Sequence, residues 1–446
     1  MNISVIGLGK LGAVMAALFA DRGHNITGVD KNRAFIDAVN EGRAPVQEPG
    51  LPELIGKNRE RLRATLDTEG AVLASDATFI IVPTPSGPDG KFSLDYVRPA
   101  VESIGNALKR KSGYHLVVLS STVMPGDTAG EVQPLLEATS GKRCGADFGL
   151  CYNPEFIALG SVIRDMSRPD MVLIGECDER AGAMLAGIYQ HVCESDYKTA
   201  RMNFVNAELT KLSVNTYVTT KISYANMLAD LCERLPGADV DTVTQALGLD
   251  KRIGPKYLKG ALGYGGPCFP RDNVAFSALA RSLGMEAILA DATQRINHLQ
   301  VPRLTSLITS LLPDGGAVGI LGLAYKPATN VIEESQGMLL AESLLKAGVP
   351  LVVYDPLAMD NAKAILGARI RYTSSVQECA AAAHLIVIMN PAEEFRALRP
   401  EHLNAERGTP AVVDCWRILP RQEFESAANY VTLGQASAPS ARSFQA

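Results

Sequence analysis

With 446 residues the chain exceeds the usual size of one hydrophobic core, so we expect two or three domains. Its 47% hydrophobic and 20% charged residues are ordinary for a globular protein, and a net charge of −5 provides no basic surface for nucleic acid. Its eight cysteines lack CxxC pairs and histidine partners, no apolar run spans a bilayer, and no signal peptide precedes the first strand, so we expect a cytoplasmic, metal-free protein without a membrane partner.

Residues 2–30 have the pattern of one βαβ unit. A β-branched strand leads into a glycine turn, an apolar-periodic helix ends near Gly23, and a second strand ends at Asp30. Gly7, Gly9 and Gly12 match the G-x-G-x-x-G pattern, whose glycines allow the tight turn, the approach of a pyrophosphate and the packing of helix on strand. The alternative is a turn that serves packing only.

Asp30 has the position of the acid that bonds the adenosine ribose 2′-OH in such units. A carboxylate there repels a 2′-phosphate, so we expect NAD rather than NADP, although Lys31 and Arg33 beside it weaken that inference. Later strands are predicted in ATFIIVPTP, HLVVLSSTV and DMVLIGE, which extends a doubly wound domain over 1–200. Thr84 and Thr122 follow two of these strands, at the edge where an open α/β sheet binds ligands.

A long helix is predicted over 206–235, because this stretch has no glycine or proline and its apolar residues recur at helical spacing. Such a helix commonly joins two domains or forms a dimer interface. Lys211 and Asn215 are four residues apart and share one face, which by itself is equally typical of a solvated face. We assign 201–300 to a central helical segment.

After Pro313 the alternation of strand and helix restarts, with strands in GAVGILGLAY, PLVVYD, HLIVIM and AVVD. This pattern predicts a second, shorter Rossmann-like domain over 301–435, and the Ser- and Ala-rich tail, 436–446, is expected to be disordered. The fold class is therefore α/β, with two Rossmann-like doubly wound domains joined by a long central helix and a helical segment.

Cys268 lies in GYGGPCFPRD, a loop governed by glycine and proline, with Arg271 and Asp272 close behind it. Loops of this kind carry chemistry more often than core, and a thiolate beside a cation is activated. In an NAD protein such a thiol can trap an aldehyde as a thiohemiacetal, whose oxidation gives a thioester that water cleaves. The alternative is a small packing residue in a tight loop.

Ten segments in the right order resemble the UDP-glucose/GDP-mannose dehydrogenase family, which oxidises a nucleotide sugar at C6 from alcohol to carboxylate with two NAD per turnover. They cover nearly the whole chain. The segments are GLGKLG (7–12), VD (29–30), EPGL (48–51), STV (121–123), NPEF (153–156), AELTKLSVNTYVTTKIS (207–223), DKRIGPKYLKG (250–260), GYGGPCFPRD (263–272), LGLAYKP (321–327) and YDP (354–356).

By this resemblance, Cys268 is the thioester nucleophile, Lys211 an acid/base or oxyanion-stabilising group, and Asn215 an amide donor to the same oxygen. Asp272 would position Lys211 or the hydrolytic water, which would be held by Glu155 together with Thr122. The cofactor contacts are expected at Gly7, Gly9, Lys10, Leu11, Gly12, Asp30, Lys31, Thr84, Pro85, Thr122 and Arg271.

The resemblance also implies where the substrate binds. Arg252, in RIG, resembles the UDP-glucose branch, in which this arginine reaches the sugar from a neighbouring subunit, so UDP-glucose and a homodimer or higher homo-oligomer are expected. Lys326 would approach the sugar diphosphate from the third domain. The substrate contacts are expected at Glu155, Phe156, Ile157, Lys211, Asn215, Arg252, Lys256, Tyr257, Tyr264, Gly265, Gly266 and Lys326.

The chain departs from the family pattern at several contact positions. These are Lys10, Leu159, Pro267, Arg271, Val331-Ile332-Glu333 and Asp414-Cys415-Trp416, with Arg417 one place after the usual arginine. Three readings therefore stay open beside the UDP-glucose enzyme: a dehydrogenase of another UDP- or GDP-sugar, a nucleotide-sugar-binding regulatory protein that has lost turnover, and a two-electron hydroxyacid dehydrogenase. The last two have no use for the thiol of Cys268.

Overall fold

The structure, a computed structural model, describes residues 1–405 and 408–436. The chain divides into two compact units, Met1–Ser213 and Val214 onward, and each is described by itself. The predicted three-domain division stays a prediction, and the expected disordered tail lies outside the described residues from position 437 on.

The first unit is built on one eight-stranded sheet with the order β3-β2-β1-β4-β5-β6-β7-β8. All neighbours are parallel except β6 and β7, which pair antiparallel. The strands are β1 (Asn2–Ile6), β2 (Asn25–Val29), β3 (Leu62–Thr65), β4 (Ala77–Ile80), β5 (His115–Leu119), β6 (Phe148–Tyr152), β7 (Met171–Glu176) and β8 (Lys198–Met202). The helices are α1 (Gly12–Asp21), α2 (Arg33–Asn40), α3 (Leu51–Lys57), α4 (Thr68–Leu73), α5 (Val97–Arg110), the π-helical turn η1 (Thr128–Val132), α6 (Gln133–Ser140), α7 (Val162–Ser167) and α8 (Glu179–Val192).

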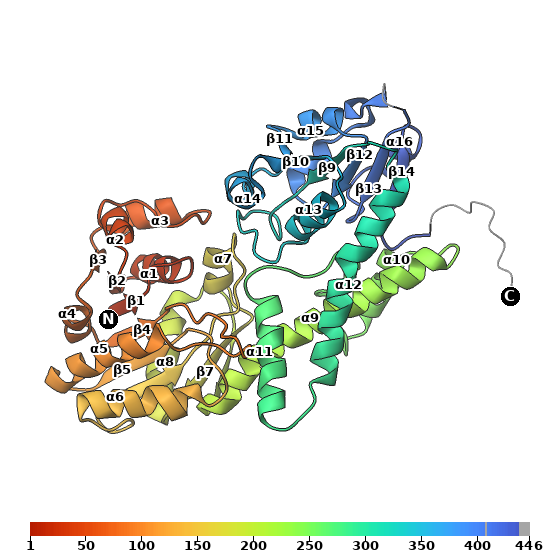
Figure 1. Cartoon of the computed structure of the whole chain (residues 1–446). Helices are drawn as coiled ribbons and strands as arrows, with labels where there is room; N and C mark the ends of the chain where they lie inside the picture. The colour runs from red at the N-terminus through yellow and green to blue at the C-terminus, as the bar shows by residue number, and fades with distance from the viewer. Residues whose placement is uncertain (406–407, 437–446) are drawn as a thin grey trace. The chain divides into compact units, whose positions relative to one another are not determined.

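Helices cover both faces of this sheet, as a doubly wound fold requires. One apolar core joins α1, α7 and α8 to the strands, and a second joins α4, α5 and α6 to the opposite face (Figure 1). Alternate strand residues face the two cores, so that Val5 packs in the first and Ile6 in the second. The central strands are apolar on both faces, which is why their sequences read as continuous hydrophobic runs.

The second unit contains most of the long helix α9 (Phe204–Arg234), which agrees with the predicted 206–235. Helices α10 (Val240–Leu249), α11 (Phe269–Ser282) and α12 (Ile288–Leu311) follow it. The remaining strands are β9 (Val318–Leu321), β10 (Leu351–Tyr354), β11 (Arg371–Tyr372), β12 (Leu385–Ile388), β13 (Ala411–Asp414) and β14 (Asn429–Thr432). The remaining helices are α13 (Gln336–Lys346), α14 (Met359–Leu366), η2 (Gly367–Arg369), α15 (Val376–Ala382), η3 (Glu393–Ala397), η4 (Pro400–His402) and α16 (Arg421–Glu425).

The second sheet repeats the topology of the first. Its strands are all parallel and have the order β11-β10-β9-β12-β13-β14, which is the dinucleotide-fold order 3-2-1-4-5-6 that β1 to β6 also follow. The glycine turn is repeated too: Gly322 after β9 has a φ of 106°, and a Cβ on Gly337 would lie 2.2 Å from the Gly322 carbonyl oxygen. The predicted second Rossmann-like domain is thus confirmed.

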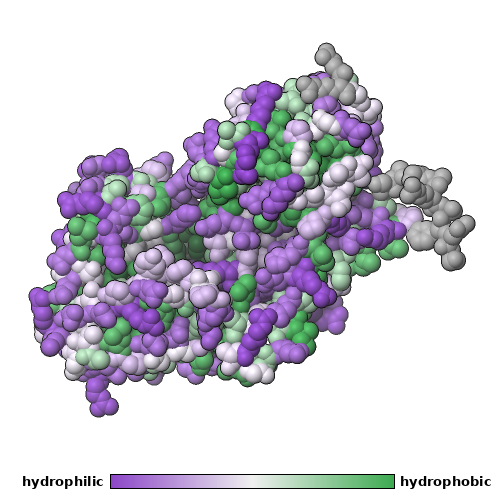
Figure 2. All heavy atoms as spheres, viewed as in Figure 1, coloured by the Kyte–Doolittle hydropathy of each residue, from purple (hydrophilic) through white to green (hydrophobic). Residues whose placement is uncertain are grey.

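No helix in residues 1–405 and 408–436 is both long and apolar enough to cross a membrane. Hydrophilic side chains cover most of the face seen in Figure 2, and hydrophobic side chains occur between them in small groups. Within the same residues, no group of three or more His, Cys, Asp or Glu side chains is arranged to hold a metal ion.

Candidate active site

The glycine turn after β1 leaves space for a dinucleotide, as the atoms around each of its glycines show. Gly7 has a φ of 99° and Gly12 packs on Gly7, because a Cβ at position 12 would lie 1.8 Å from the Gly7 carbonyl oxygen. A Cβ on Gly9, in contrast, would meet no protein atom within 4 Å. Packing within the chain therefore explains the first and third glycines, whereas the second leaves room for a ligand at the N-terminus of α1. No side chain caps that helix end, so its amides remain available to a phosphate.

Asp30 follows β2, at the position predicted from the sequence. Its Oδ2 accepts a hydrogen bond of 2.6 Å from the amide of Leu8, and its Oδ1 accepts one of 2.8 Å from the amide of Asn32. The carboxylate is thereby held beside the glycine turn. Carboxylate oxygens have more than one acceptor position, so Asp30 can hold the turn and still bind a ribose hydroxyl.

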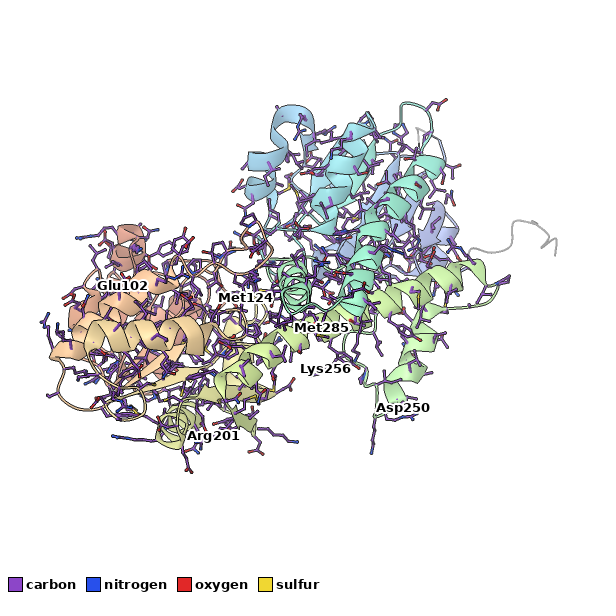
Figure 3. The ribbon with its side chains drawn as sticks, turned by 60° about the horizontal axis from the view of Figure 1, so that its bottom comes forward. Glu102, Met124, Arg201, Asp250, Lys256 and Met285 are labelled. Atoms are coloured by element: carbon purple, nitrogen blue, oxygen red, sulfur yellow. The ribbon has the colours of Figure 1, made fainter. Side chains whose placement is uncertain are left out.

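The loop that follows β5 carries Thr122, and it is fixed from two sides. The Thr84 hydroxyl, after β4, donates to the Thr122 carbonyl oxygen at 2.7 Å. Glu208 on α9 is fully buried, and its carboxylate accepts from the amides of Gly126 at 2.7 Å and Thr128 at 2.9 Å. Burial raises the pKa of Glu208. Figure 3 labels Met124 in this loop.

Lys211 is nearly buried and lies on α9 one helical turn after Glu208. Its ammonium donates a hydrogen bond of 2.7 Å to the Glu155 carbonyl oxygen and stands 4.7 Å from the centre of the Phe156 ring. The structure thus brings together two predicted site residues, Lys211 and Glu155, that are 56 positions apart. Their catalytic roles stay predictions.

The Glu155 side chain contacts Tyr189, a buried residue that the sequence analysis did not select and that in turn contacts the buried Asn153. The Tyr189 hydroxyl, on α8, lies 2.7 Å from Glu155 Oε1 and 2.6 Å from Asn153 Oδ1. Burial raises the pKa of Glu155, and the hydrogen-bonded contact with Tyr189 and then the Lys211 ammonium oppose this shift. Burial and the neighbouring Glu155 raise the pKa of Tyr189 as well.

The loop after Glu155 is anchored by Glu48, the acid of the EPGL segment. The Glu48 carboxylate is buried and accepts from the amides of Gly160 and Val162, both at 2.8 Å. Glu48 thus satisfies two backbone amides at the start of α7. Leu159, one of the positions that depart from the family pattern, packs against the core of the first unit.

In the second unit, Cys268 is exposed and occupies the N-cap of α11. The positive end of the helix dipole faces this position, which favours a negative charge such as a thiolate or an oxyanion. One turn later, Asp272 is almost completely buried, and its carboxylate accepts from the Asn215 amide at 2.6 Å. Arg271 pairs with the same carboxylate at 3.3 Å. The exposed Cys268 and the buried Asp272 therefore lie on α11, and the Asn215 amide that binds Asp272 lies on α9.

Two asparagine side chains hold the chain segment that leads to Cys268. Asn226 on α9 donates to the Leu262 carbonyl oxygen at 2.8 Å and accepts from the Ala261 amide at 2.9 Å. Asn297 on α12 binds both backbone groups of Tyr264 in the same way, at 2.7 and 3.0 Å. Each asparagine amide binds backbone N–H and C=O groups of the loop, as the backbone of a neighbouring strand does in a sheet. These bonds hold the loop in place although it contains little regular structure.

Gly265 and Gly266 allow this loop to pack closely against residues 325–334. A Cβ on Gly265 would lie 2.2 Å from the Glu334 carbonyl oxygen, and one on Gly266 would lie 2.6 Å from the Tyr325 ring. The Gly266 amide donates to the Glu333 carbonyl oxygen at 3.0 Å. Lys326 belongs to this same segment, so the glycines and Lys326 are held on neighbouring stretches of chain.

Other predicted substrate residues lie on the surface of the second unit. Arg252 is exposed and pairs with Asp250, which Figure 3 labels together with Lys256. Tyr257 is exposed and has a φ of 64°. Arg252 is thus held by Asp250, and its assignment to the sugar of a neighbouring subunit stays a prediction.

Arg417, the displaced arginine of the family pattern, is nearly buried. Its guanidinium binds both carboxylate oxygens of Asp241 at 2.8 and 3.0 Å and donates to the Gly260 carbonyl oxygen at 2.7 Å. Its φ is 56°. Trp416 donates its indole N–H to the Met389 carbonyl oxygen at 2.9 Å. In this chain Arg417 therefore ties the end of β13 to α10 and to the segment before the Cys268 loop.

Comparison with known proteins places this site in a family. The chain matches the UDP-glucose/GDP-mannose dehydrogenase family in its NAD binding domain over residues 1–193, its central domain over 205–299 and its UDP binding domain over 319–421. A UDP-glucose 6-dehydrogenase of Haloferax volcanii is 38% identical over 427 residues, which cover 95% of this chain and 98% of that protein.

Two further comparisons agree. A GDP-mannose 6-dehydrogenase of Azotobacter vinelandii is 37% identical over 359 residues, which cover 80% of this chain and 81% of that protein. The solved structure of a UDP-glucose dehydrogenase from Pyrobaculum islandicum superimposes with a TM-score of 0.88 at 37% identity, and covers 97% of this chain and 98% of that one. The chain therefore belongs to the UDP-glucose/GDP-mannose dehydrogenase family and is an NAD-dependent nucleotide-sugar dehydrogenase.

Proposed function

We propose that this protein oxidises the C6 hydroxymethyl group of UDP-glucose to a carboxylate in two NAD-dependent steps, through a thiohemiacetal and a thioester on Cys268. The observation that carries the proposal is the exposed thiol at the N-cap of α11, one turn before the buried Asp272–Asn215 pair. The match to the UDP binding domain and the resemblance to two UDP-glucose dehydrogenases support the choice of substrate.

The glycine turn and Asp30 would hold the cofactor, with Thr84, Pro85 and Thr122 at the neighbouring strand ends. NAD, when bound, accepts two electrons and a hydrogen nucleus from C6 in each oxidation. The open space at Gly9 would admit its pyrophosphate, and the Asp30 carboxylate would accept a hydrogen bond from its ribose hydroxyl.

The chain's own residues carry the remaining chemistry. In the first oxidation the C6 hydroxyl gives up its proton to Lys211, which acts here as the neutral amine and thereby becomes the ammonium that donates to the Glu155 carbonyl oxygen. The Cys268 sulfur then adds to the aldehyde carbon, and the resulting oxyanion is stabilised by Lys211 and the Asn215 amide. The second oxidation leaves a thioester. Water adds to its carbonyl carbon, the C–S bond breaks, and the thiolate of Cys268 leaves with the carboxylate product formed.

Asp272 and Asn215 act together in this scheme. Asp272 accepts one amide hydrogen of Asn215 at 2.6 Å, which fixes the orientation of that amide and leaves its second N–H for the C6 oxygen. Glu155 and Thr122 are assigned to the hydrolytic water.

The test of this proposal is Cys268→Ser, measured against a panel of UDP- and GDP-sugars by NADH release and by mass analysis of the product. A serine hydroxyl is a weaker nucleophile than a thiol, so binding of NAD and sugar should persist while formation of the uronic acid collapses. Cys144→Ser, at a half-buried cysteine in the first unit, is the control and should retain wild-type turnover. Substantial uronic-acid formation by a folded Cys268→Ser protein would refute the covalent mechanism through Cys268.

The same panel tests a second substrate. The resemblance to a GDP-mannose 6-dehydrogenase at 37% identity supports GDP-mannose as the alternative. A higher kcat/KM for GDP-mannose than for UDP-glucose would identify GDP-mannose as the preferred substrate. The absence of turnover with every sugar would favour a regulatory protein that binds a nucleotide sugar.

We further propose that the protein is a homodimer through α9. Large apolar side chains remain exposed along this helix at Tyr217, Tyr224 and Leu231, seven residues apart, with Met227 and Leu235 beside them. Residues at this spacing form one stripe on a helix, and such a stripe is typical of a helix that packs against another. Light scattering that shows a monomer at micromolar concentration would contradict this proposal.

A further inference from the structure

The hydrogen bonds around Glu155 bear on its protonation state as well as on its position. Tyr189 and Asn153 are buried, and the Tyr189 oxygen has two oxygen neighbours, Asn153 Oδ1 at 2.6 Å and Glu155 Oε1 at 2.7 Å. A phenol has one proton, so Tyr189 can donate to only one of them. The other short contact between two oxygens needs a proton from a different source.

The orientation of Asn153 decides which contact Tyr189 satisfies. The Asn153 Nδ2 donates to the Leu173 carbonyl oxygen at 2.9 Å. The flipped amide would place its oxygen against that carbonyl, with no proton between them. Oδ1 therefore faces Tyr189, and since an amide oxygen is only an acceptor, the Tyr189 proton must lie on this contact.

It follows that the contact between Glu155 and Tyr189 needs a proton from Glu155. A neutral Glu155 completes one continuous chain, in which Glu155 donates to Tyr189, Tyr189 to Asn153, and Asn153 to Leu173. An ionised Glu155 leaves two buried oxygens 2.6 or 2.7 Å apart without a proton between them.

We propose that Tyr189 and Asn153 are positioning residues that hold Glu155 as a neutral carboxylic acid in the resting enzyme. Glu155 then enters the reaction as a hydrogen-bond donor to an oxygen atom of substrate or water, not as a ready base. This inference rests on the proposed function for its catalytic meaning, because that function assigns Glu155 to the site.

The charged and titratable surroundings are consistent with a neutral acid. The Lys211 ammonium on α9 is bonded to the Glu155 backbone carbonyl and forms no ion pair with the carboxyl group in this structure. The other facing group is Cys193, just after α8, with Arg22 near it. Burial raises the pKa of Glu155, which favours its proton, and the contacts with Tyr189 and Lys211 lower this pKa by smaller amounts.

The experiment is difference infrared spectroscopy of the free full-length enzyme at neutral pH, wild type minus Glu155→Gln. We expect the wild type to show one additional carbonyl-stretch band of a protonated carboxylic acid, which is separate from the bands of ionised carboxylates. A difference spectrum that contains only a carboxylate band would overturn the proposal.

Tyr189→Phe tests the part played by the hydroxyl and keeps the ring that packs in the core. If Glu155 donates to Tyr189, loss of the hydroxyl removes a hydrogen bond from the neutral form, and the titration midpoint of the band falls by about one pH unit. If Tyr189 instead donates to an ionised Glu155, the midpoint rises, and a rise or no change refutes the assignment. Tyr96→Phe, at an exposed tyrosine of the same unit, is the control and should leave the midpoint unchanged.

These measurements use no substrate, so they separate this inference from the proposed function. The band and its shift are observable in a protein without turnover. Wild-type turnover of Cys268→Ser would refute the covalent mechanism, and the carboxylic-acid band would still support a neutral Glu155. An ionised Glu155 in an enzyme that needs Cys268 would refute only the inference about Glu155.

Discussion

Glu208 is predicted to hold the Thr122 loop in place, and its removal is the sharpest test of the loop geometry. The carboxylate is fully buried and is the acceptor for two backbone amides, those of Gly126 and Thr128. Glu208→Ala leaves both donors without a partner in a site closed to water. At about 1–3 kcal/mol for each unsatisfied donor, the loop should lose about 2–6 kcal/mol of local stability.

Glu208→Gln should have a smaller effect. The glutamine side chain keeps the size of Glu208 and one acceptor oxygen, but its NH2 group opposes the second amide N–H, so we expect a loss of about 1–3 kcal/mol. Glu102→Ala is the control, because Glu102 is exposed on α5 (Figure 3) and such substitutions usually change stability by less than about 0.5 kcal/mol.

The assay is native-state hydrogen exchange read by mass spectrometry on peptides that contain Gly126 and Thr128, together with urea unfolding. Protection should fall in the order wild type, Glu208→Gln, Glu208→Ala, and turnover should fall with it because Thr122 loses its fixed position. If Glu208→Ala retains wild-type protection at these two amides, the carboxylate does not hold the loop.

Three further predictions concern single residues of the two units. Arg417→Leu should destabilise the second unit by about 1–3 kcal/mol in urea, because it removes the bidentate partner of Asp241, a partly buried carboxylate that keeps its ion pair with Lys259; unchanged unfolding would contradict this. Asp30→Ala should weaken NAD binding about tenfold by calorimetry through the loss of one hydrogen-bond acceptor, and an equal affinity would exclude the assigned role. Burial lowers the pKa of His115 to about 3, whereas an unfolded histidine has a pKa of about 6.5. Between these values the unfolded state binds more protons, so stability should fall as pH drops through this window, and calorimetry of His115→Gln should show a flatter pH dependence.

Local patterns in the chain were sufficient to predict both Rossmann-like domains, the helix over 206–235 and the glycine turn at Gly7. Each of these features is encoded by neighbouring residues, through hydrophobic period or through a glycine that a turn requires. The predicted strand GAVGILGLAY was longer than β9, which ends at Leu321 because Gly322 turns the chain with a positive φ. The antiparallel pairing of β7 with β6 was not predicted, because the sequence of a strand does not indicate its direction in the sheet.

The same limit applies to the site. Cys268, Lys211 and Asp30 were selected because they occupy recognisable segments and because a family resemblance supported them, and their roles stay predictions. Tyr189 and Glu208 were missed, although each contacts a loop that carries a predicted site residue. Their partners lie 34 and 80 positions away in the chain, at Glu155 and Thr128. A buried tyrosine or glutamate in a helix has no sequence pattern that names its partner, because hydrogen bonds between distant segments form only when the packed core brings those segments together.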